Sequence, residues 1–145
     1  MDTLVVDLET FYSKDYSLTK LTTQEYIDDP RFETIGLAVK KNNEPTQSFS
    51  GTFEETQHWL YSFPWTTSIG IAHNAMFDFS ILSWKFGLHP KLIADTLSMG
   101  RALRGMSVGG SLKALAEYYG VGIKGDEVLN AIGKRREDFS EEELD

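Results

Sequence analysis

The stretch Val5-Val6-Asp7-Leu8-Glu9-Thr10 decides the fold, because an apolar run ends in two carboxylates that a single residue separates. If residues 3–9 form a strand, Asp7 and Glu9 share one face and Leu8 points into the opposite layer. Two carboxylates this close at the end of a buried strand repel each other unless a cation neutralises them. Oxygen ligands of this kind favour a hard divalent ion, Mg²⁺ or Mn²⁺. The alternative is an Asp-x-Glu that is simply solvated at the surface.

A second segment, residues 69–82, supplies a third carboxylate. Residues 69–72 are expected to form a strand, and Asn74 suits the N-cap of a helix over residues 75–86. Asp78 follows one turn later among apolar neighbours, where a lone carboxylate is costly to bury. It therefore either occupies the solvent face of the helix or faces Asp7 and Glu9 across a groove and shares their metal site.

Taken together, Asp7-x-Glu9-Thr10 and Asn74-x-x-x-Asp78 resemble the first two motifs of the DEDD 3′–5′ exonucleases. Within that superfamily the sequence resembles the proofreading domain of family A DNA polymerases, particularly those of bacteriophages. Residues 16–18, 22–27 and 29–33 are similar to the insert that such phage polymerases carry after the first motif. Residues 95–97 and 111–116 are similar to later framework segments, so the resemblance extends over almost the whole chain.

The resemblance implies a ribonuclease-H-like α/β fold, a mixed sheet flanked by helices, with residues 1–145 as one 3′–5′ exonuclease domain. It implies two-metal hydrolysis of the 3′-terminal phosphodiester of single-stranded DNA, with Mg²⁺ or Mn²⁺ as cofactor. The catalytic and metal-binding residues would be Asp7, Glu9 and Asp78, with Asp7 bridging both ions. The residues that position the terminal nucleotide would be Thr10, Asn74 and Phe77. An RNA-directed 3′ exonuclease of the same fold and a non-catalytic binding module remain open alternatives.

The order of elements along the chain supports this fold. Strands are expected over residues 3–9, 34–40, 47–49, 69–72 and 92–94, with helices near residues 24–27, after 52, and over 75–86, 96–103 and 111–119. Thr52 and Glu55 form a capping box, and Asp95 is suited to cap the helix that follows it. In a ribonuclease-H-like fold the first strand is central, so its carboxylates lie beside a helix that crosses the sheet.

Composition restricts the classes of function. The chain has 145 residues, no cysteine and a net charge of −8, so disulfides and thiolate metal sites are excluded. Its three histidines lack zinc-ligand spacing, and its apolar runs are too short for a membrane span, so a soluble protein of the cytoplasm (the host cytoplasm if phage-encoded) is expected. The acidic charge argues against a simple nucleic-acid binder, although bound divalent ions and a partner domain can supply positive charge.

The last residues carry a separate expectation. Ser140 and Glu143 form a capping box, yet the sequence ends at Asp145, inside the first turn of the helix that this box would open. In the resembling family this helix carries the third motif, a Tyr or His followed by a fourth metal-binding Asp. The resemblance therefore predicts a domain that is incomplete at its C-terminal end. Cleavage would be feeble unless a downstream segment or a polymerase domain, fused or separate, supplies the helix.

Overall fold

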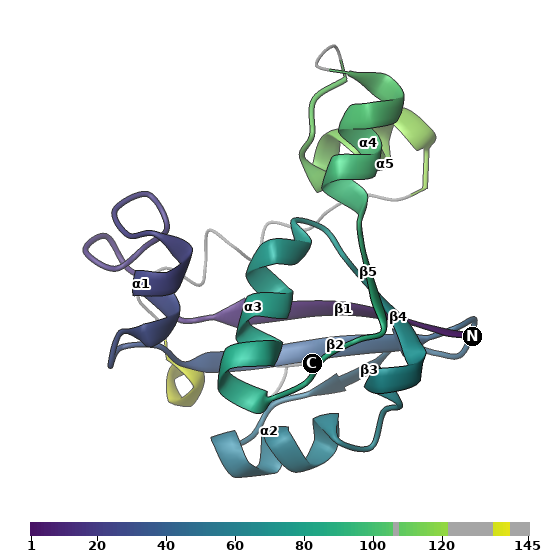
Figure 1. Cartoon of the computed structure of the whole chain (residues 1–145). Coiled ribbons are helices and arrows are strands. Elements are labelled where there is room, and N and C mark those ends of the chain that lie inside the picture. The colour runs from purple at the N-terminus through teal and green to yellow at the C-terminus, as the bar shows by residue number, and fades with distance from the viewer. Residues whose placement is uncertain (106–107, 122–134, 140–145) are drawn as a thin grey trace.

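A computed structural model of the chain describes residues 1–105, 108–121 and 135–139. The five strands form one mixed sheet in the order β3-β2-β1-β4-β5, with β1 at its centre as predicted (Figure 1). The elements, in chain order, are β1 (Asp2–Thr10), α1 (Thr23–Asp28), β2 (Thr34–Lys41), β3 (Gln47–Phe49), α2 (Phe53–Leu60), η1 (Trp65–Thr67), β4 (Ser68–Ala72), α3 (Ala75–Phe86), β5 (Leu92–Asp95), α4 (Thr96–Arg104), α5 (Leu112–Tyr119) and η2 (Arg136–Asp138). The expected strands and helices are all present within a residue or two of their predicted bounds.

The central strand is paired from Leu4 to Thr10 on one side and only over its first residues on the other. It runs antiparallel to β2, with Val6 opposite Val39 and Leu8 opposite Leu37. Its parallel pairing with β4 covers Asp2–Val5, after which β4 leads into α3. The second half of β1 therefore presents its β4-side edge to α3 rather than to a strand.

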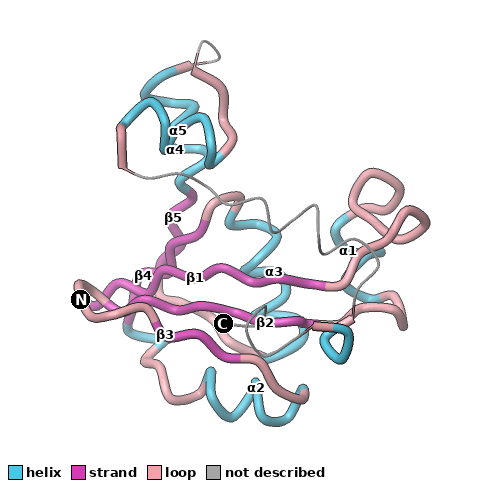
Figure 2. Tube along the Cα trace, turned by 180° about the vertical axis from the view of Figure 1, so that it is seen from behind, coloured by secondary structure: helices cyan, strands magenta, loops and turns pink. Residues whose placement is uncertain are grey.

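The two faces of β1 differ as the alternating sequence predicts. Leu4, Val6 and Leu8 are buried, whereas Val5, Asp7 and Glu9 are exposed on what we call the outer face. Helix α3 crosses the sheet in front of β1 in Figure 1 and behind it in Figure 2, so it covers the inner face. Each fully buried aliphatic side chain there contributes about 1.5–3 kcal/mol.

The close packing of α3 on the sheet depends on a glycine in β4. A Cβ atom on Gly70 would lie 2.5 Å from the ring of Phe79, so a larger residue would push α3 outward. Phe86, at the other end of α3, stacks on Phe53 of α2 with ring centroids 4.9 Å apart. Helices α2 and α3 thus share the inner face and close the core.

Helix ends confirm some of the predicted caps and correct one. Thr52 and Glu55 form the expected capping box on α2. Asn74 occupies the N-cap position of α3 but has left-handed backbone angles, φ 62° and ψ 59°, and its side chain makes no capping hydrogen bond. Instead, Asp95 Oδ1 accepts a hydrogen bond from Asn74 N at 2.9 Å and another from Leu97 N at 2.9 Å. One carboxylate therefore holds the starts of both α3 and α4.

Two predictions concern the ends and surfaces of the chain. The predicted capping box of Ser140 and Glu143, with Asp145, lies outside the described residues. Within the part that is described, no helix has the length and apolar character needed to cross a membrane.

Candidate acidic site and its neighbouring cavity

Asp78 is buried at the free edge of β1. Its side chain is only 4% exposed, so the reading of Asp78 as a solvent-facing helix residue is wrong. Its Oδ1 accepts a hydrogen bond from Leu8 N at 3.2 Å. Leu8 lies beyond the point where pairing of β1 with β4 ends. The Asp78 side chain of α3 therefore provides the hydrogen-bond acceptor for Leu8 N that β4 does not provide.

Burial and neighbouring charges raise the pKa of Asp78. Desolvation raises the pKa most, followed by the negative charge of Asp7 and, more weakly, that of Glu9. Hydrogen bonds from Leu8 N and from the backbone of Asp78 itself lower it, and the resulting pKa is about 7. Near neutral pH the side chain is therefore divided between its protonated and ionised forms. The three predicted carboxylates lie close enough to interact electrostatically.

The carboxylates do not form a closed metal cage in this structure. Asp7 and Glu9 are exposed on the outer face, whereas Asp78 reaches the strand edge from the inner side. Among the described residues, no group of three His, Cys, Asp or Glu side chains is arranged to hold a metal ion. The donor chemistry nevertheless fits Mg²⁺ or Mn²⁺, because all donors are oxygens and a cation would relieve the repulsion that raises the pKa of Asp78.

A cavity of about 280 Å³ opens directly beside Glu9. Thr10 and Phe77, both predicted to contact a terminal nucleotide, line it, whereas Asn74 does not. The other wall residues were not identified from the sequence; they are Leu8, Tyr12, Ser17, Leu18 and Tyr26. Its mostly apolar and aromatic walls, with an acidic group at the rim, suit a flat, partly polar ring system.

The segment after β1 is fixed by a hydrogen-bond chain through Tyr26. Its hydroxyl donates to the Phe11 carbonyl oxygen, and because it has one proton, Thr10 Oγ1 is the donor in the 2.8 Å contact between the two hydroxyls. Tyr16 donates to the Tyr26 carbonyl at 2.5 Å, and the two rings stack with centroids 4.4 Å apart. Phe77 of α3 lies 5.8 Å from the Tyr26 ring. The cavity wall is thus bound to β1 on one side and to α3 on the other.

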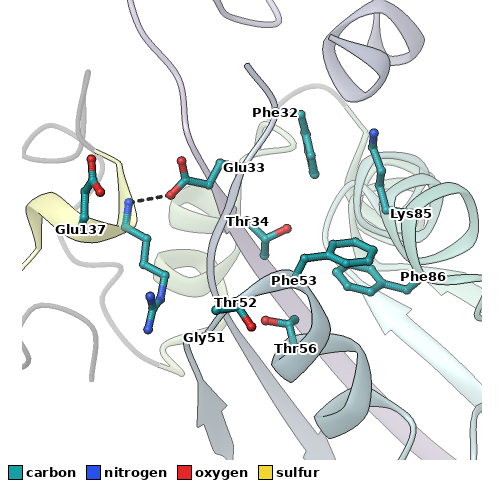
Figure 3. A pocket seen from close by; sticks show the side chains of 11 residues that line it. Phe32, Glu33, Thr34, Gly51, Thr52, Phe53, Thr56, Lys85, Phe86 and Glu137 are labelled. Atoms are coloured by element: carbon teal, nitrogen blue, oxygen red, sulfur yellow. Dashed lines mark hydrogen bonds between the residues drawn. The ribbon is translucent and has the colours of Figure 1, made fainter. Parts of the chain in front are cut away.

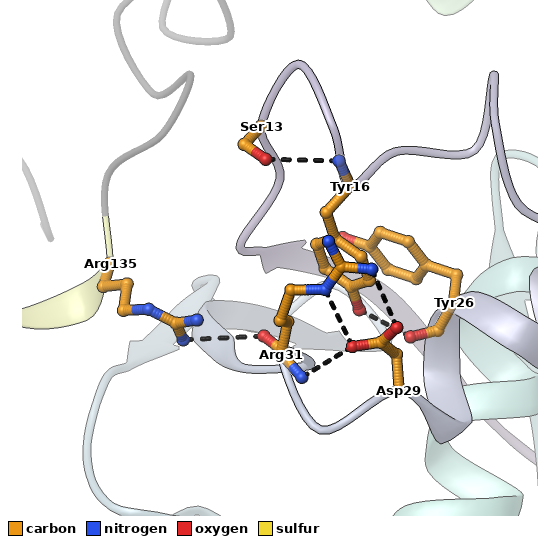
Figure 4. Close-up of polar contacts among 6 residues, drawn as sticks. All are labelled: Ser13, Tyr16, Tyr26, Asp29, Arg31 and Arg135. Carbon is orange, nitrogen blue, oxygen red and sulfur yellow. Dashed lines mark hydrogen bonds and ion pairs between the residues drawn. The ribbon is translucent and has the colours of Figure 1, made fainter.

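Arginine side chains also stabilise the segment between β1 and β2, and Figure 4 shows Arg31 and Arg135 there. Arg31 donates twice to the Asp29 carboxylate, at 2.9 Å each, and its guanidinium lies over the Tyr16 ring. Arg135 pairs with Glu33 at 2.6 Å and lies 4.0 Å from the centroid of Phe11. The first described residues after position 134 therefore pack against this segment.

A second, larger cavity of about 490 Å³ lies at the opposite end of α3 from Asp78 (Figure 3). Three of its ionic groups have partners within the fold: Glu33 accepts from Arg136 N at 2.9 Å, Arg136 Nε donates to Ser50 Oγ at 2.9 Å, and Lys85 lies over the Phe32 ring. No predicted site residue lines it. The smaller cavity is the one that adjoins the acidic residues.

No protein-family model and no curated protein matches the sequence. Fold and strand order define a ribonuclease-H-like α/β domain, and solved nuclease structures share it. NrnC of Brucella melitensis aligns with a TM-score of 0.66 and 16% identity over 98% of this chain and 63% of NrnC. A structure described as the apo form of the nuclease aligns at 0.65, with 18% identity over 98% of this chain and 62% of its own.

A family B DNA polymerase from Pyrobaculum calidifontis also shares the fold, with a TM-score of 0.56 and 18% identity over 85% of this chain and 19% of the polymerase. Other NrnC structures contain bound Mg²⁺ or pGG. The chain spans about three fifths of the length of these NrnC structures. At these identities the comparisons establish the fold.

Proposed function

We propose that this domain is a metal-dependent 3′–5′ exonuclease that hydrolyses the terminal phosphodiester of single-stranded DNA. The observation that carries the proposal is the buried Asp78 carboxylate, whose pKa is raised by burial and by Asp7 and Glu9. Glu9 also lines a mostly apolar cavity of about 280 Å³. The likeness to NrnC with Mg²⁺ and to a DNA polymerase supports it. A role beside a DNA polymerase domain, fused or separate and of the phage type, belongs to the same proposal.

Each acidic residue has a distinct part in this function. When bound, two Mg²⁺ or Mn²⁺ ions would supply the positive charge that activates water and stabilises the leaving oxygen. Asp7 and Glu9 would hold them on the outer face, where solvent and a phosphate have access. Asp78 would complete the donor set in its ionised form, which a cation favours.

The cavity residues would hold the terminal nucleotide. Phe77 and Leu18 offer apolar surface to a base, and Thr10, whose hydroxyl is engaged by Tyr26, offers a fixed backbone beside Glu9. Asn74 would act through its place at the start of α3, since it does not line the cavity. The terminal nucleotide would thereby place its 5′ phosphate near the acidic residues.

An RNA-directed exonuclease of the same fold is the second candidate. NrnC bound to pGG, which aligns with a TM-score of 0.64 and 15% identity, supports a short oligonucleotide as a substrate. The resemblance of residues 22–32 to a phage polymerase insert favours DNA.

The test is degradation of 5′-labelled DNA and RNA 12-mers of matched sequence, with Mg²⁺ or Mn²⁺ and with chelator. Any cleavage should produce a ladder that shortens from the 3′ end, depends on metal and is absent in Asp7→Ala, while Glu54→Ala on α2 should behave like wild type. In parallel, calorimetric titration with Mn²⁺ should show weakened binding for Asp7→Ala. Equal Mn²⁺ affinity in wild type and Asp7→Ala would overturn the site, and preferential degradation of the RNA 12-mer would favour the second candidate.

A further inference from the structure

Helices α4 and α5 form a projection with little core of its own. They lie side by side and away from the sheet in both Figure 1 and Figure 2. Within the described part of this pair, Gly100 and Leu115 are the buried residues. A Cβ atom on Gly100 would lie 2.7 Å from Leu115 Cδ1, so the helices touch closely there. Most other side chains of the pair face solvent and are available for contacts.

The projection is basic although the protein is acidic. Residues 96–121 contain three cationic side chains, Arg101, Arg104 and Lys113, and one acidic side chain, Glu117, whereas the whole chain has 14 cationic and 22 acidic residues. All three cations are exposed. A local positive surface on a negatively charged protein attracts a polyanion and steers it to that place.

Aromatic rings lie directly beside these cations. Tyr118 and Tyr119 are 53% and 46% exposed. Arg104 Nε donates to the Tyr119 hydroxyl at 2.9 Å, and its guanidinium lies 5.2 Å and 5.4 Å from the two ring centroids. Exposed rings next to cations are the combination with which proteins bind single strands, because bases stack on the rings and phosphates meet the cations.

The projection is attached to the helix that carries Asp78. His73, just before α3, contacts Thr96 Oγ1 through Nδ1 at 2.9 Å and the Gly110 carbonyl oxygen through Nε2 at 2.8 Å. Asp95 holds the first residues of both α3 and α4, as described above. Asp78 lies in the first turn of α3, about 4.5 Å along the helix axis from its start at Ala75. A strand whose end lies at the acidic site can therefore extend over α4 and α5.

We propose that Arg101, Arg104, Lys113, Tyr118 and Tyr119 form a strand-binding surface for single-stranded nucleic acid on the 5′ side of the terminal nucleotide. Charge complementarity identifies the occupant as a polyanion, and the tyrosines favour unpaired bases. The direction of the strand rests on the proposed exonuclease function, whereas binding itself does not. Met99, Leu103 and Val121 are also exposed nearby, so a protein partner is the competing occupant.

Binding is tested first without catalysis. Fluorescence anisotropy of a labelled dT12 oligonucleotide, titrated with the full chain in chelator, measures affinity at several salt concentrations. We expect Arg104→Glu and Lys113→Glu each to weaken binding roughly tenfold and to lower the salt dependence, and Tyr118→Ala to weaken it about fivefold or more. The charge-matched control is Lys91→Glu, an exposed residue at the far end of β5 from α4, which should bind like wild type. Thermal melts establish that each variant is folded.

Cleavage separates this inference from the proposed function. If wild type degrades DNA, it should prefer a 12-mer over a dinucleotide, because the dinucleotide is too short to span α4 and α5. Arg104→Glu should reduce this preference by about the same factor by which it weakens dT12 binding. Weakened dT12 binding in a protein that cleaves nothing would support the surface and count against the nuclease. Folded variants that bind dT12 like Lys91→Glu overturn the surface. Unchanged dT12 binding together with concentration-dependent self-association that Leu103→Asp abolishes would instead assign the surface to a protein contact.

Discussion

Asp78 has two opposing roles in the fold at the scale of a single residue. Its carboxylate completes the hydrogen bonding of Leu8 N at an unpaired strand edge, which favours a buried acceptor. The same burial, next to Asp7 and Glu9, disfavours its charge and raises its pKa to about 7. An apolar residue would leave Leu8 N without this partner, and an ionised carboxylate is poorly accommodated without a cation.

The first prediction is that Asp78→Asn removes much of the pH dependence of stability in the metal-free protein. In the folded state the pKa is about 7, against an ordinary value of about 3.9 in the unfolded chain. Between these values the folded state binds more protons, so stability falls as pH rises from about 4 to about 7, by up to about 4 kcal/mol. Asparagine keeps an oxygen for Leu8 N and has no charge to desolvate.

Urea unfolding in chelator at pH 5 and pH 8 measures this difference. Wild type should be less stable at pH 8 by an amount that Asp78→Asn largely abolishes, and the variant should be the more stable of the two proteins at pH 8. Identical pH profiles for both proteins would show that Asp78 is not the buried titrating group.

At the scale of elements, the starts of α3 and α4 depend on a carboxylate outside either helix. Asp95 ends β5, and its Oδ1 accepts from Asn74 N and Leu97 N while its Oδ2 accepts from Ser98 Oγ at 3.2 Å. These hydrogen bonds lower the pKa of Asp95. Because the side chain of the left-handed Asn74 does not cap α3, Asp95 at the end of β5 provides the carboxylate acceptor at the start of α3.

We therefore predict that Asp95→Ala destabilises the protein by about 2 kcal/mol, twice the usual cost of one lost N-cap. Ser111→Ala, which removes the single side-chain cap of α5, should cost about half as much. Asp95→Asn keeps an acceptor oxygen and should lie close to wild type. Urea denaturation measures all three, and equal losses for Asp95→Ala and Ser111→Ala would contradict the shared cap.

The segment between β1 and β2 is the second element-scale feature, because one hydroxyl joins it to the strand. Tyr26→Phe keeps the ring stack but leaves the Phe11 carbonyl and the Thr10 hydroxyl without this partner. We expect a loss of about 1–3 kcal/mol in stability. If the proposed function holds, KM for oligonucleotides should rise more than kcat falls. The substitution alters the wall of the cavity that would bind the terminal nucleotide and leaves the proposed catalytic carboxylates in place. Tyr61→Phe, which removes a surface hydroxyl contact with Phe86 O, is the matched control.

At the scale of the whole molecule, the features that neighbouring residues determine could be predicted from the sequence, whereas contacts between distant segments could not. The alternation around Asp7 and Glu9 correctly indicated a strand, and Thr52 with Glu55 marked the start of α2, because both signals lie within a few residues. The central position of that strand came from the resemblance to a ribonuclease-H-like fold. The dual role of Asp95 joins segments 21 residues apart, and the cavity wall needs Tyr26 and Phe77 to meet, which no local pattern reveals. Helix α5 shows the same limit, since Leu112, Leu115 and Tyr119 have the spacing of one apolar face and yet Leu112 and Tyr119 are exposed.

The last prediction concerns the effect of divalent ions on the stability of the entire domain. A ligand that binds only the folded state stabilises it by about 2.7 kcal/mol at a hundred times its dissociation constant. At pH 8 an ion meets an ionised Asp78 beside two other carboxylates, so binding also removes their repulsion. At pH 5 a proton occupies Asp78, whose pKa is about 7, and competes with the ion.

Mn²⁺ should therefore raise the melting temperature more at pH 8 than at pH 5. It should thereby restore much of the stability that the metal-free protein loses as pH rises. Asp7→Ala should respond little at either pH, and Glu54→Ala should respond like wild type. A Mn²⁺ response of equal size at both pH values would mean that the ion binds away from Asp78. The acidic pair on β1 and the buried acid on α3 would then form a structural cluster that shares no ligand.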